Sequence, residues 1–163
     1  MCIRDRCKTG HTFIKQKIRE TNALLGGEMS GHIFFNDRWP GFDDGIYAGA
    51  RMLEIIANSE QDDPFVTVPN MLSTPEINIP AADEEKFQIV KTFIENSKFS
   101  DAKIVSIDGI RVEFEKGWGL LRPSNTSPCL VLRFEAETDN DLNKIKKIFY
   151  SGLKSIKPDI NKF

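Results

Sequence analysis

The segment Arg122-Pro123-Ser124-Asn125-Thr126-Ser127-Pro128 carries side chains well suited to binding a phosphate group. An arginine guanidinium matches two phosphate oxygens at once, and hydroxyls and turn amides can fill the remaining acceptor sites of a dianion. The segment contains no Asp or Glu that would repel that dianion. The pattern therefore predicts a loop that holds phosphate. The alternative is a structural turn in which Arg122 pairs with a carboxylate.

A second segment, Gly27-Glu28-Met29-Ser30-Gly31-His32, combines glycines with polar side chains. Glu28 and Ser30 are two positions apart, so they would share one side of an extended segment. A carboxylate beside a hydroxyl suits two neighbouring sugar hydroxyls, and His32 would add a group that titrates near neutral pH. A hairpin turn that needs only its glycines would also explain the segment.

Two smaller polar clusters allow a functional and a structural interpretation. In Lys8-Thr9-Gly10-His11, two basic side chains flank a glycine at an expected helix start, where free amides favour an anion; a solvated turn is the alternative. Asp43 and Asp44 also precede a helix, and we interpret them as caps rather than metal ligands. Three cysteines without a C-x-x-C pair predict neither a zinc site nor a disulfide framework.

The composition places the chain among soluble globular proteins. It has 163 residues, 40% hydrophobic and 28% charged, with a formal net charge of −2. The small negative charge argues against a general nucleic-acid-binding protein. No apolar run is long enough to span a bilayer, and the first residues lack the apolar core of a signal peptide. We therefore expect a cytoplasmic protein without nucleic-acid or membrane partners.

In the first part of the chain, periodicity predicts a helix over 11–21, short strands at 24–25 and 32–35, and a second helix after Asp44. The apolar residues of this second helix keep helical spacing and are expected to pack in a core. They are Ile46, Tyr47, Ala50, Leu53 and Ile56.

The later part predicts an α+β arrangement. Residues 75–80 suit an edge strand, Asp83 is expected to cap a helix, and Asp108-Gly109 predicts a hairpin between 103–107 and 110–115. A strand over 129–135 and a helix from Asp139 follow. The expected buried residues of the two helices are Phe87, Val90, Phe93 and Ile94, then Leu142, Ile145, Ile148, Phe149 and Leu153. The fold class is therefore a C-terminal α+β domain, with helices on a mostly antiparallel sheet, preceded by a partial α/β domain.

Three motifs, K-T-G-H at 8–11, G-E-M-S-G-H at 27–32 and R-P-S-N-T-S-P at 122–128, carry a family resemblance. In order and spacing they resemble the phosphomannomutase/phosphoglucomutases of the α-D-phosphohexomutase superfamily. The resemblance implies four segments. Residues 1–7 are an unmatched N-terminal remnant, 8–60 the later part of the α/β domain 3, 61–82 a Pro-rich linker with the first strand of the next domain, and 83–163 the α+β domain 4.

The resemblance implies an isomerase that interconverts hexose 1-phosphate and 6-phosphate, with glucose or mannose as the sugar. The family uses a phosphoserine in domain 1, a glucose or mannose 1,6-bisphosphate intermediate, and Mg²⁺ held by an Asp-rich loop in domain 2. Neither the serine loop nor the Asp-rich loop occurs in these 163 residues. We therefore expect Mg²⁺ to bind outside this chain, domains 1 and 2 of the same enzyme to be its partners, and the isolated chain to be inactive. The alternatives are a non-catalytic sugar-phosphate binding or regulatory module, and a domain without a ligand.

The resemblance also implies a role for each motif residue. Those expected to bind the sugar are Glu28, Ser30, Lys8 and His11. Those expected to bind the phosphate that is not reacting are Arg122, Ser124, Asn125 and Thr126. His32 would be an auxiliary group near the reacting end, with no catalytic nucleophile and no metal ligand in this chain. Asn125 favours the phosphomannomutase/phosphoglucomutase branch over glucosamine-phosphate mutases, which resemble R-x-S-G-T-x-P.

Overall fold

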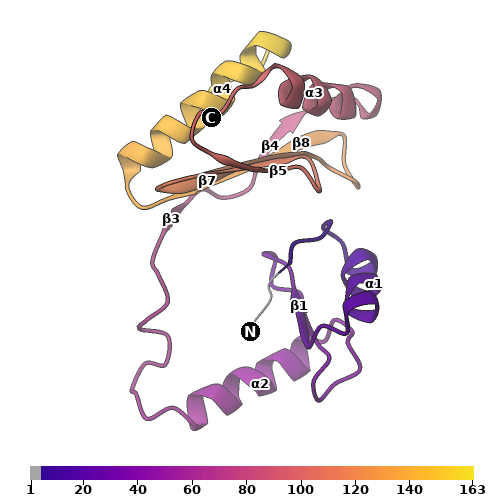
Figure 1. Cartoon of the computed structure of the whole chain (residues 1–163), viewed down its shortest axis with the longest axis vertical. Helices are drawn as coiled ribbons and strands as arrows, with labels where there is room; N and C mark the ends of the chain where they lie inside the picture. The colour runs from indigo at the N-terminus through magenta and orange to yellow at the C-terminus, as the bar shows by residue number, and fades with distance from the viewer. Residues whose placement is uncertain (1–4) are drawn as a thin grey trace. The chain divides into compact units, whose positions relative to one another are not determined.

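Four helices and eight strands follow one another in the computed structural model, which describes residues 5–163. They fall into two units, Met1–Pro69 and Asn70–Phe163. Figure 1 shows a helix–hairpin–helix arrangement in the first unit and a sheet with two helices in the second. Every strand pair in the described residues is antiparallel, and the α+β class predicted for the C-terminal domain is confirmed.

The first unit is built around α1 (His11–Thr21), β1 (Leu25–Gly27) and β2 (Ile33–Phe35). The predicted helix over 11–21 is confirmed, and it ends at Asn22, whose left-handed backbone (φ 53°) suits a helix C-terminus. Ile14 and Ile18 are buried together with Phe34 of β2. Gly26 of β1 lies directly under them, where an added Cβ would come within 2.8 Å of Ile14 Cγ2.

The helix α2 (Gly45–Ala57) corrects one prediction. No residue of α2 is buried, and Ile46 is 90% exposed, so the expected core stripe is wrong for this chain. The small core of the first unit lies between α1 and the hairpin, whereas α2 contacts the hairpin through the half-buried Tyr47 and Arg51. Tyr47 packs edge-on against Phe35 with ring centres 5.6 Å apart, and the Arg51 guanidinium lies 4.3 Å from the centre of the Phe35 ring.

The second unit contains one sheet made of the remaining strands. They are β3 (Leu72–Ser73), β4 (Ile77–Pro80), β5 (Lys103–Val105), β6 (Ile110–Phe114), β7 (Gly117–Pro123) and β8 (Cys129–Ala136). The order is β3-β8-β7-β6-β5, and β4 also pairs with β8. The predicted hairpin around Asp108-Gly109 is present as β5 and β6, and the predicted strand over 75–80 is present as β4.

Sequence reasoning missed β7 as a strand because two glycines and a proline interrupt its apolar pattern. Packing explains why residue 119 is a glycine, since an added Cβ would lie 2.5 Å from the Phe149 ring. The glycine therefore lets the ring of an overlying helix approach the strand closely.

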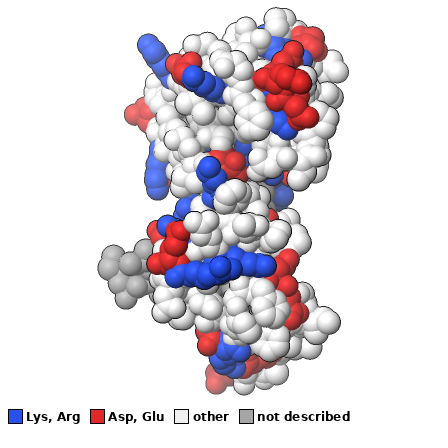
Figure 2. Space-filling model, turned by 90° about the vertical axis from the view of Figure 1, so that its right-hand side faces the viewer, with Lys and Arg blue, Asp and Glu red and all other residues white. Residues whose placement is uncertain are grey.

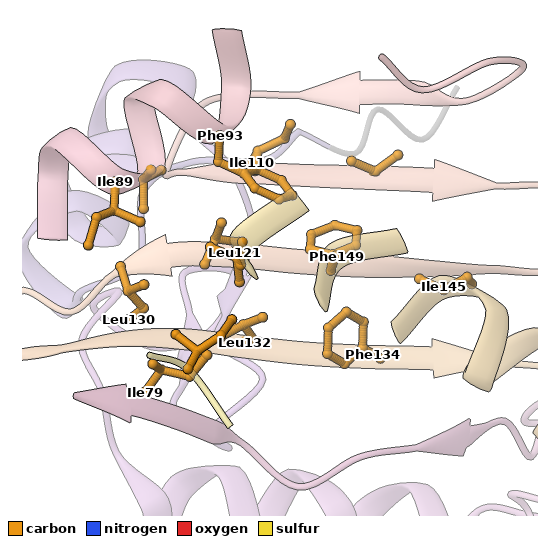
Figure 3. Packing of buried hydrophobic residues seen from close by; sticks show 14 of the residues in the cluster. Ile79, Ile89, Phe93, Ile110, Leu121, Leu130, Leu132, Phe134, Ile145 and Phe149 are labelled. Atoms are coloured by element: carbon orange, nitrogen blue, oxygen red, sulfur yellow. The ribbon is translucent and has the colours of Figure 1, made fainter. Parts of the chain in front are cut away.

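Two helices, α3 (Asp83–Asn96) and α4 (Asp139–Ile156), cover one face of this sheet (Figure 1). Phe93 of α3 and Ile145 and Phe149 of α4 pack onto the strands, as Figure 3 shows. The Phe149 ring lies 5.4 Å from that of Phe93 and 5.3 Å from that of Phe134. The apolar side chains between the sheet and the two helices form the core of this unit.

The buried face of α3 differs from the predicted one by a rotation of part of a turn about the helix axis. Phe87 is 55% exposed, whereas Lys86 and Ile89 are buried beside Val90 and Phe93. The Asp83 cap is also wrong: Ala82 is the N-cap residue and Asp83 is the first helical residue. In α4 the start at Asp139 is confirmed, but Ile148 is 43% exposed.

Candidate functional site

The Arg122 loop, by which we mean residues 122–128, begins inside β7. Arg122 pairs with Val131 and Pro123 pairs with Leu130, so only residues 124–128 connect β7 to β8. The expectation that Arg122 itself lies in a loop is therefore corrected: it is a strand residue. A strand holds the guanidinium stem more rigidly than a loop would.

Ser124 organises the connection. Its residue is only 7% exposed, and its hydroxyl oxygen accepts hydrogen bonds from the backbone N–H groups of Thr126 (3.4 Å) and Ser127 (3.1 Å). Its own N–H donates to the Cys129 carbonyl at 3.0 Å. These bonds curl the chain into a compact turn and leave the Ser124 hydroxyl proton available as a donor.

The remaining polar side chains of the Arg122 loop are available to a ligand. Asn125 and Thr126 are exposed, and within residues 5–163 their side chains make no hydrogen bond. Arg122 makes no ion pair with any described residue. Because Leu121 is buried under the helices, Arg122 points to the opposite face of the sheet. The loop thus presents a guanidinium, an amide and a hydroxyl without a carboxylate among its own residues.

A buried lysine supports the Arg122 loop from α3. The Lys86 side chain is 5% exposed, and its ammonium donates to the Ser127 carbonyl oxygen at 3.1 Å and to Asp83 Oδ1 at 2.6 Å. The Pro128 carbonyl accepts from the Ala81 N–H at 3.0 Å. The sequence offered no signal for Lys86, because the loop it contacts lies 41 residues further along the chain.

In the first unit, the Glu28 turn (residues 27–32) closes the β1–β2 hairpin. The Glu28 N–H donates to the His32 carbonyl at 2.8 Å, and the Gly31 N–H donates to the Glu28 carbonyl at 3.0 Å. Gly31 has φ 90°, a conformation that suits glycine. The Ser30 hydroxyl donates to Glu28 Oε2 at 3.3 Å. The two side chains therefore meet, through a turn rather than the extended segment that the spacing suggested.

His32 has a partner that the sequence did not reveal. Its Nδ1 lies 2.7 Å from Asp43 Oδ2, and Asp43 forms a backbone bridge with Phe34. The neighbouring Asp44 caps α2 by accepting from the N–H groups of Ile46 (3.0 Å) and Tyr47 (2.9 Å). The interpretation of both acids as caps is confirmed for Asp44 and wrong for Asp43.

The K-T-G-H segment leads into α1. Gly10 is the N-cap residue with φ 130°, and His11 is the exposed first residue of the helix. The Lys8 ammonium lies 5.8 Å from the centre of the Phe13 ring. Nearby, burial raises the pKa of the Cys7 thiol; the Lys17 ammonium lowers it and the Glu28 carboxylate adds to the increase. The side chains of Lys17 and Glu28 thus lie near the Cys7 thiol.

Charge is distributed without a continuous basic surface on the side drawn in Figure 2, where Lys and Arg alternate with Asp and Glu in small groups. Within residues 5–163, no group of three or more His, Cys, Asp or Glu side chains could hold a metal ion. Nor does any helix in that range combine the length and hydropathy needed to cross a membrane.

Comparison with known proteins connects the two units to consecutive domains of one family. The description "Phosphoglucomutase/phosphomannomutase, alpha/beta/alpha domain III" matches residues 4–67, and that of the C-terminal domain matches residues 76–151. The chain belongs to the phosphoglucomutase/phosphomannomutase family. The sheet carrying the Arg122 loop therefore corresponds to the C-terminal domain of this family, and the Glu28 turn to its domain III.

Relatives within the phosphoglucomutase/phosphomannomutase family are similar over nearly the whole chain. A phosphomannomutase/phosphoglucomutase of Pseudomonas syringae pv. tomato is 53% identical over 156 residues, which are 94% of this chain and 34% of that protein. A phosphoglucomutase of Neisseria gonorrhoeae is 47% identical over 151 residues, 91% of this chain and 33% of that protein. This chain therefore spans about a third of the length of the curated relatives it matches.

A solved structure agrees with the computed one. The crystal structure of a phosphoglucomutase/phosphomannomutase family protein from Burkholderia thailandensis superimposes with a TM-score of 0.85 and is 48% identical. The superposition covers 96% of this chain and 34% of that one.

Proposed function

We propose that this chain provides the sugar-binding turn and one phosphate-binding loop of a phosphohexomutase. The whole enzyme would interconvert hexose 1-phosphate and hexose 6-phosphate, with mannose or glucose as the sugar, through a phosphoserine and a bisphosphate intermediate. In this role Glu28 and Ser30 bind sugar hydroxyls, with Lys8 and His11 nearby. The residues that bind the phosphate that is not reacting are Arg122, Ser124, Asn125 and Thr126.

The observation that carries this proposal is the internal closure of the Arg122 loop by the Ser124 hydroxyl. Because that oxygen accepts two loop amides, the turn is preformed without a ligand. The side-chain donors of Arg122, Asn125 and Thr126 make no hydrogen bond within residues 5–163. A preformed set of donors with no carboxylate among residues 122–128 suits a phosphate dianion.

Binding a phosphate remote from the reaction has a physical purpose. Remote binding energy holds the sugar in a reactive geometry and lowers the entropic cost of the phosphoryl transfer at the other end. The Glu28–Ser30 pair suits this task because a carboxylate and a hydroxyl together accept from and donate to sugar hydroxyls.

The chemical step itself is assigned to other domains of the same enzyme. Mg²⁺ would bind in that part of the protein, beside the phosphoserine, where it would stabilise charge on the transferred phosphoryl group. We propose that those domains are the partners of this chain and that the protein is cytoplasmic. The purified 163-residue chain is expected to show no mutase turnover, and turnover without added protein would contradict this assignment.

A nuclear magnetic resonance titration of the chain tests binding. Inorganic phosphate and glucose 6-phosphate should both shift the amide signals of Ser124 to Thr126, whereas only the sugar phosphate should shift those of Glu28 and Ser30. Signals of both loops that do not move at millimolar ligand would overturn the proposal. A non-catalytic sugar-phosphate module would bind in the same way, so the coding sequence upstream distinguishes it: an in-frame serine loop and Asp-rich loop establish the enzyme.

A further inference from the structure

The hydrogen bond between His32 and Asp43 defines which ring nitrogen of the histidine carries a proton. Nδ1 lies 2.7 Å from Asp43 Oδ2. An ionised carboxylate can only accept hydrogen bonds, so Nδ1 must be the donor. In the neutral imidazole the other nitrogen, Nε2, is then unprotonated. Nε2 makes no hydrogen bond with residues 5–163, and the His32 side chain is 55% exposed.

Asp43 is held in place by its own backbone and by its neighbour. It bridges to Phe34, which is fully buried in the core of the first unit. The next residue, Asp44, is fixed as the cap of α2 by two backbone N–H groups. A carboxylate on such a constrained segment can hold a ring in one orientation, as a carboxylate does for a metal-bound or catalytic imidazole.

The ring belongs to the same turn as the proposed sugar-binding pair. The His32 carbonyl accepts the Glu28 N–H at 2.8 Å, and the Ser30 hydroxyl contacts Glu28 Oε2. Of the two carboxylates of Glu28 and Asp43, only that of Asp43 forms a hydrogen bond with the imidazole within residues 5–163.

We propose that Asp43 is a positioning residue that keeps His32 in its Nδ1–H tautomer, so that Nε2 is presented as a hydrogen-bond acceptor to a hydroxyl of the bound hexose phosphate. This role rests on the proposed function, because the acceptor needs a sugar phosphate beside the Glu28 turn. The tautomer itself does not depend on a ligand.

The tautomer is measured from the ¹⁵N chemical shifts of the imidazoles in the 163-residue chain, at a pH high enough that these shifts no longer change with pH. The chain has only two histidines, and the exposed His11 at the start of α1 is an internal reference. His32 should be mostly Nδ1–H, whereas His11 should show the Nε2–H form that an unconstrained histidine side chain favours in water. A His32 ring that is mostly Nε2–H overturns the proposal without any variant.

Two variants separate positioning from general destabilisation. Asp43→Ala should return His32 to the Nε2–H form and leave His11 unchanged. Asp37→Ala is the matched control, because Asp37 lies in the same segment but pairs with Arg51 at 2.8 Å; it should leave the His32 tautomer unchanged. A tautomer that is the same in Asp43→Ala and in the parent chain, or that changes equally in Asp37→Ala, overturns the proposal.

A kinetic measurement on the full-length mutase carrying these domains tests the consequence. Asp43→Ala should lower kcat about tenfold or more, with a smaller change in KM. If phosphate shifts the amide signals of the Arg122 loop but His32 is not Nδ1–H, the role of Asp43 is refuted and the proposed function is not affected. If His32 is Nδ1–H but no sugar phosphate binds, the proposed function fails and the His32–Asp43 pair is structural.

Discussion

The Lys86 ammonium and the Ser127 carbonyl oxygen lie 3.1 Å apart, which ties the first turn of α3 to the Arg122 loop through a buried cation. Lys86 is 4% exposed, whereas its carboxylate partner Asp83 has a side chain that is 68% exposed. A buried lysine is rare unless it is paired and hydrogen-bonded. Here it meets both conditions, and the second partner is the backbone of the loop proposed to hold phosphate.

Replacing Lys86 with methionine should lower the affinity for phosphate while changing the free energy of unfolding only slightly. Methionine fills a similar volume, and the Ser127 carbonyl keeps its second donor, the Cys129 N–H at 2.9 Å. The free energy of unfolding should therefore change by only about 1 kcal/mol, while the affinity for inorganic phosphate falls about tenfold. Urea unfolding and a phosphate titration measure the two quantities.

Lys91→Met is the matched control for Lys86→Met. The Lys91 side chain lies on the same helix, is 68% exposed, and pairs only loosely with Glu95 at 4.0 Å. Lys91→Met should leave both the free energy of unfolding and the affinity for inorganic phosphate unchanged. Equal losses of phosphate affinity in the two variants would show that Lys86 acts only through the overall charge.

Arg122→Ala should reduce phosphate affinity roughly 10- to 100-fold, because a hydrogen bond to a charged group contributes about 1.5–3 kcal/mol. Arg122 makes no ion pair with residues 5–163, so its removal leaves no carboxylate unpaired and stability should change little. Lys103→Ala, on strand β5 of the same sheet with a 76% exposed side chain, is the control. Isothermal titration with glucose 6-phosphate gives both affinities. Unchanged affinity would remove Arg122 from the site.

Glu28→Gln should weaken the binding of hexose phosphate while leaving inorganic phosphate binding intact. The amide keeps one acceptor oxygen for the Ser30 hydroxyl but loses the charge that favours sugar hydroxyl donors. Glu20→Gln, an exposed residue of α1 that accepts from Gln16 at 2.7 Å, serves as the control. Comparing the two ligands in one titration series decides the outcome, since equal loss for both would mean that Glu28 is structural.

Gly109→Ala should destabilise the second unit and disturb the Arg122 loop. Gly109 has φ 72°, and an added Cβ would lie 2.2 Å from the Leu121 carbonyl oxygen and 2.6 Å from Arg122 Cα. The combined backbone strain and overlap should cost about 2–5 kcal/mol. Gly45→Ala at the start of α2, where an added Cβ meets nothing within 4 Å, is the control. Thermal unfolding followed by circular dichroism compares the two, and similar melting temperatures would contradict the prediction.

The first unit should lose stability in acid through Asp37. Hydrogen bonding by the Arg51 side chain and the Arg38 backbone lowers the pKa of this carboxyl from 3.8 to about 2. A lowered folded-state pKa means that the ionised form favours folding. The contribution is complete above the unfolded value of 3.8 and is lost as the pH falls toward about 2. Asp37→Asn should flatten this part of the pH–stability profile, measured by tryptophan fluorescence. The same acid sensitivity in Asp37→Asn and in the parent chain would rule out Asp37 as its source.

Local patterns predicted the parts of the fold that depend on neighbouring residues. The helix over 11–21, the hairpin around Asp108-Gly109 and the strand over 129–135 follow from periodicity and turn chemistry. The β7 strand was missed because Gly117, Gly119 and Pro123 interrupt its apolar pattern. The two glycines are needed for the close approach of other elements rather than for strand propensity.

Burial was harder to predict than secondary structure. The apolar residues of α2 have the spacing of a core stripe, yet none is buried, because burial depends on what packs against a helix and not on its own pattern. The same reason explains Phe87, which is exposed, whereas Ile89 two residues later in α3 is buried.

The sequence by itself determined which polar side chains share each loop, because side-chain type and close spacing are sufficient to place Ser30 beside Glu28 and backbone donors around Ser124. Only the tertiary structure decided which residues support them. Asp43 reaches His32 across 11 positions and Lys86 reaches Ser127 across 41. Such pairs form when the packing of separate elements brings distant side chains together, and that information is not contained in any local pattern.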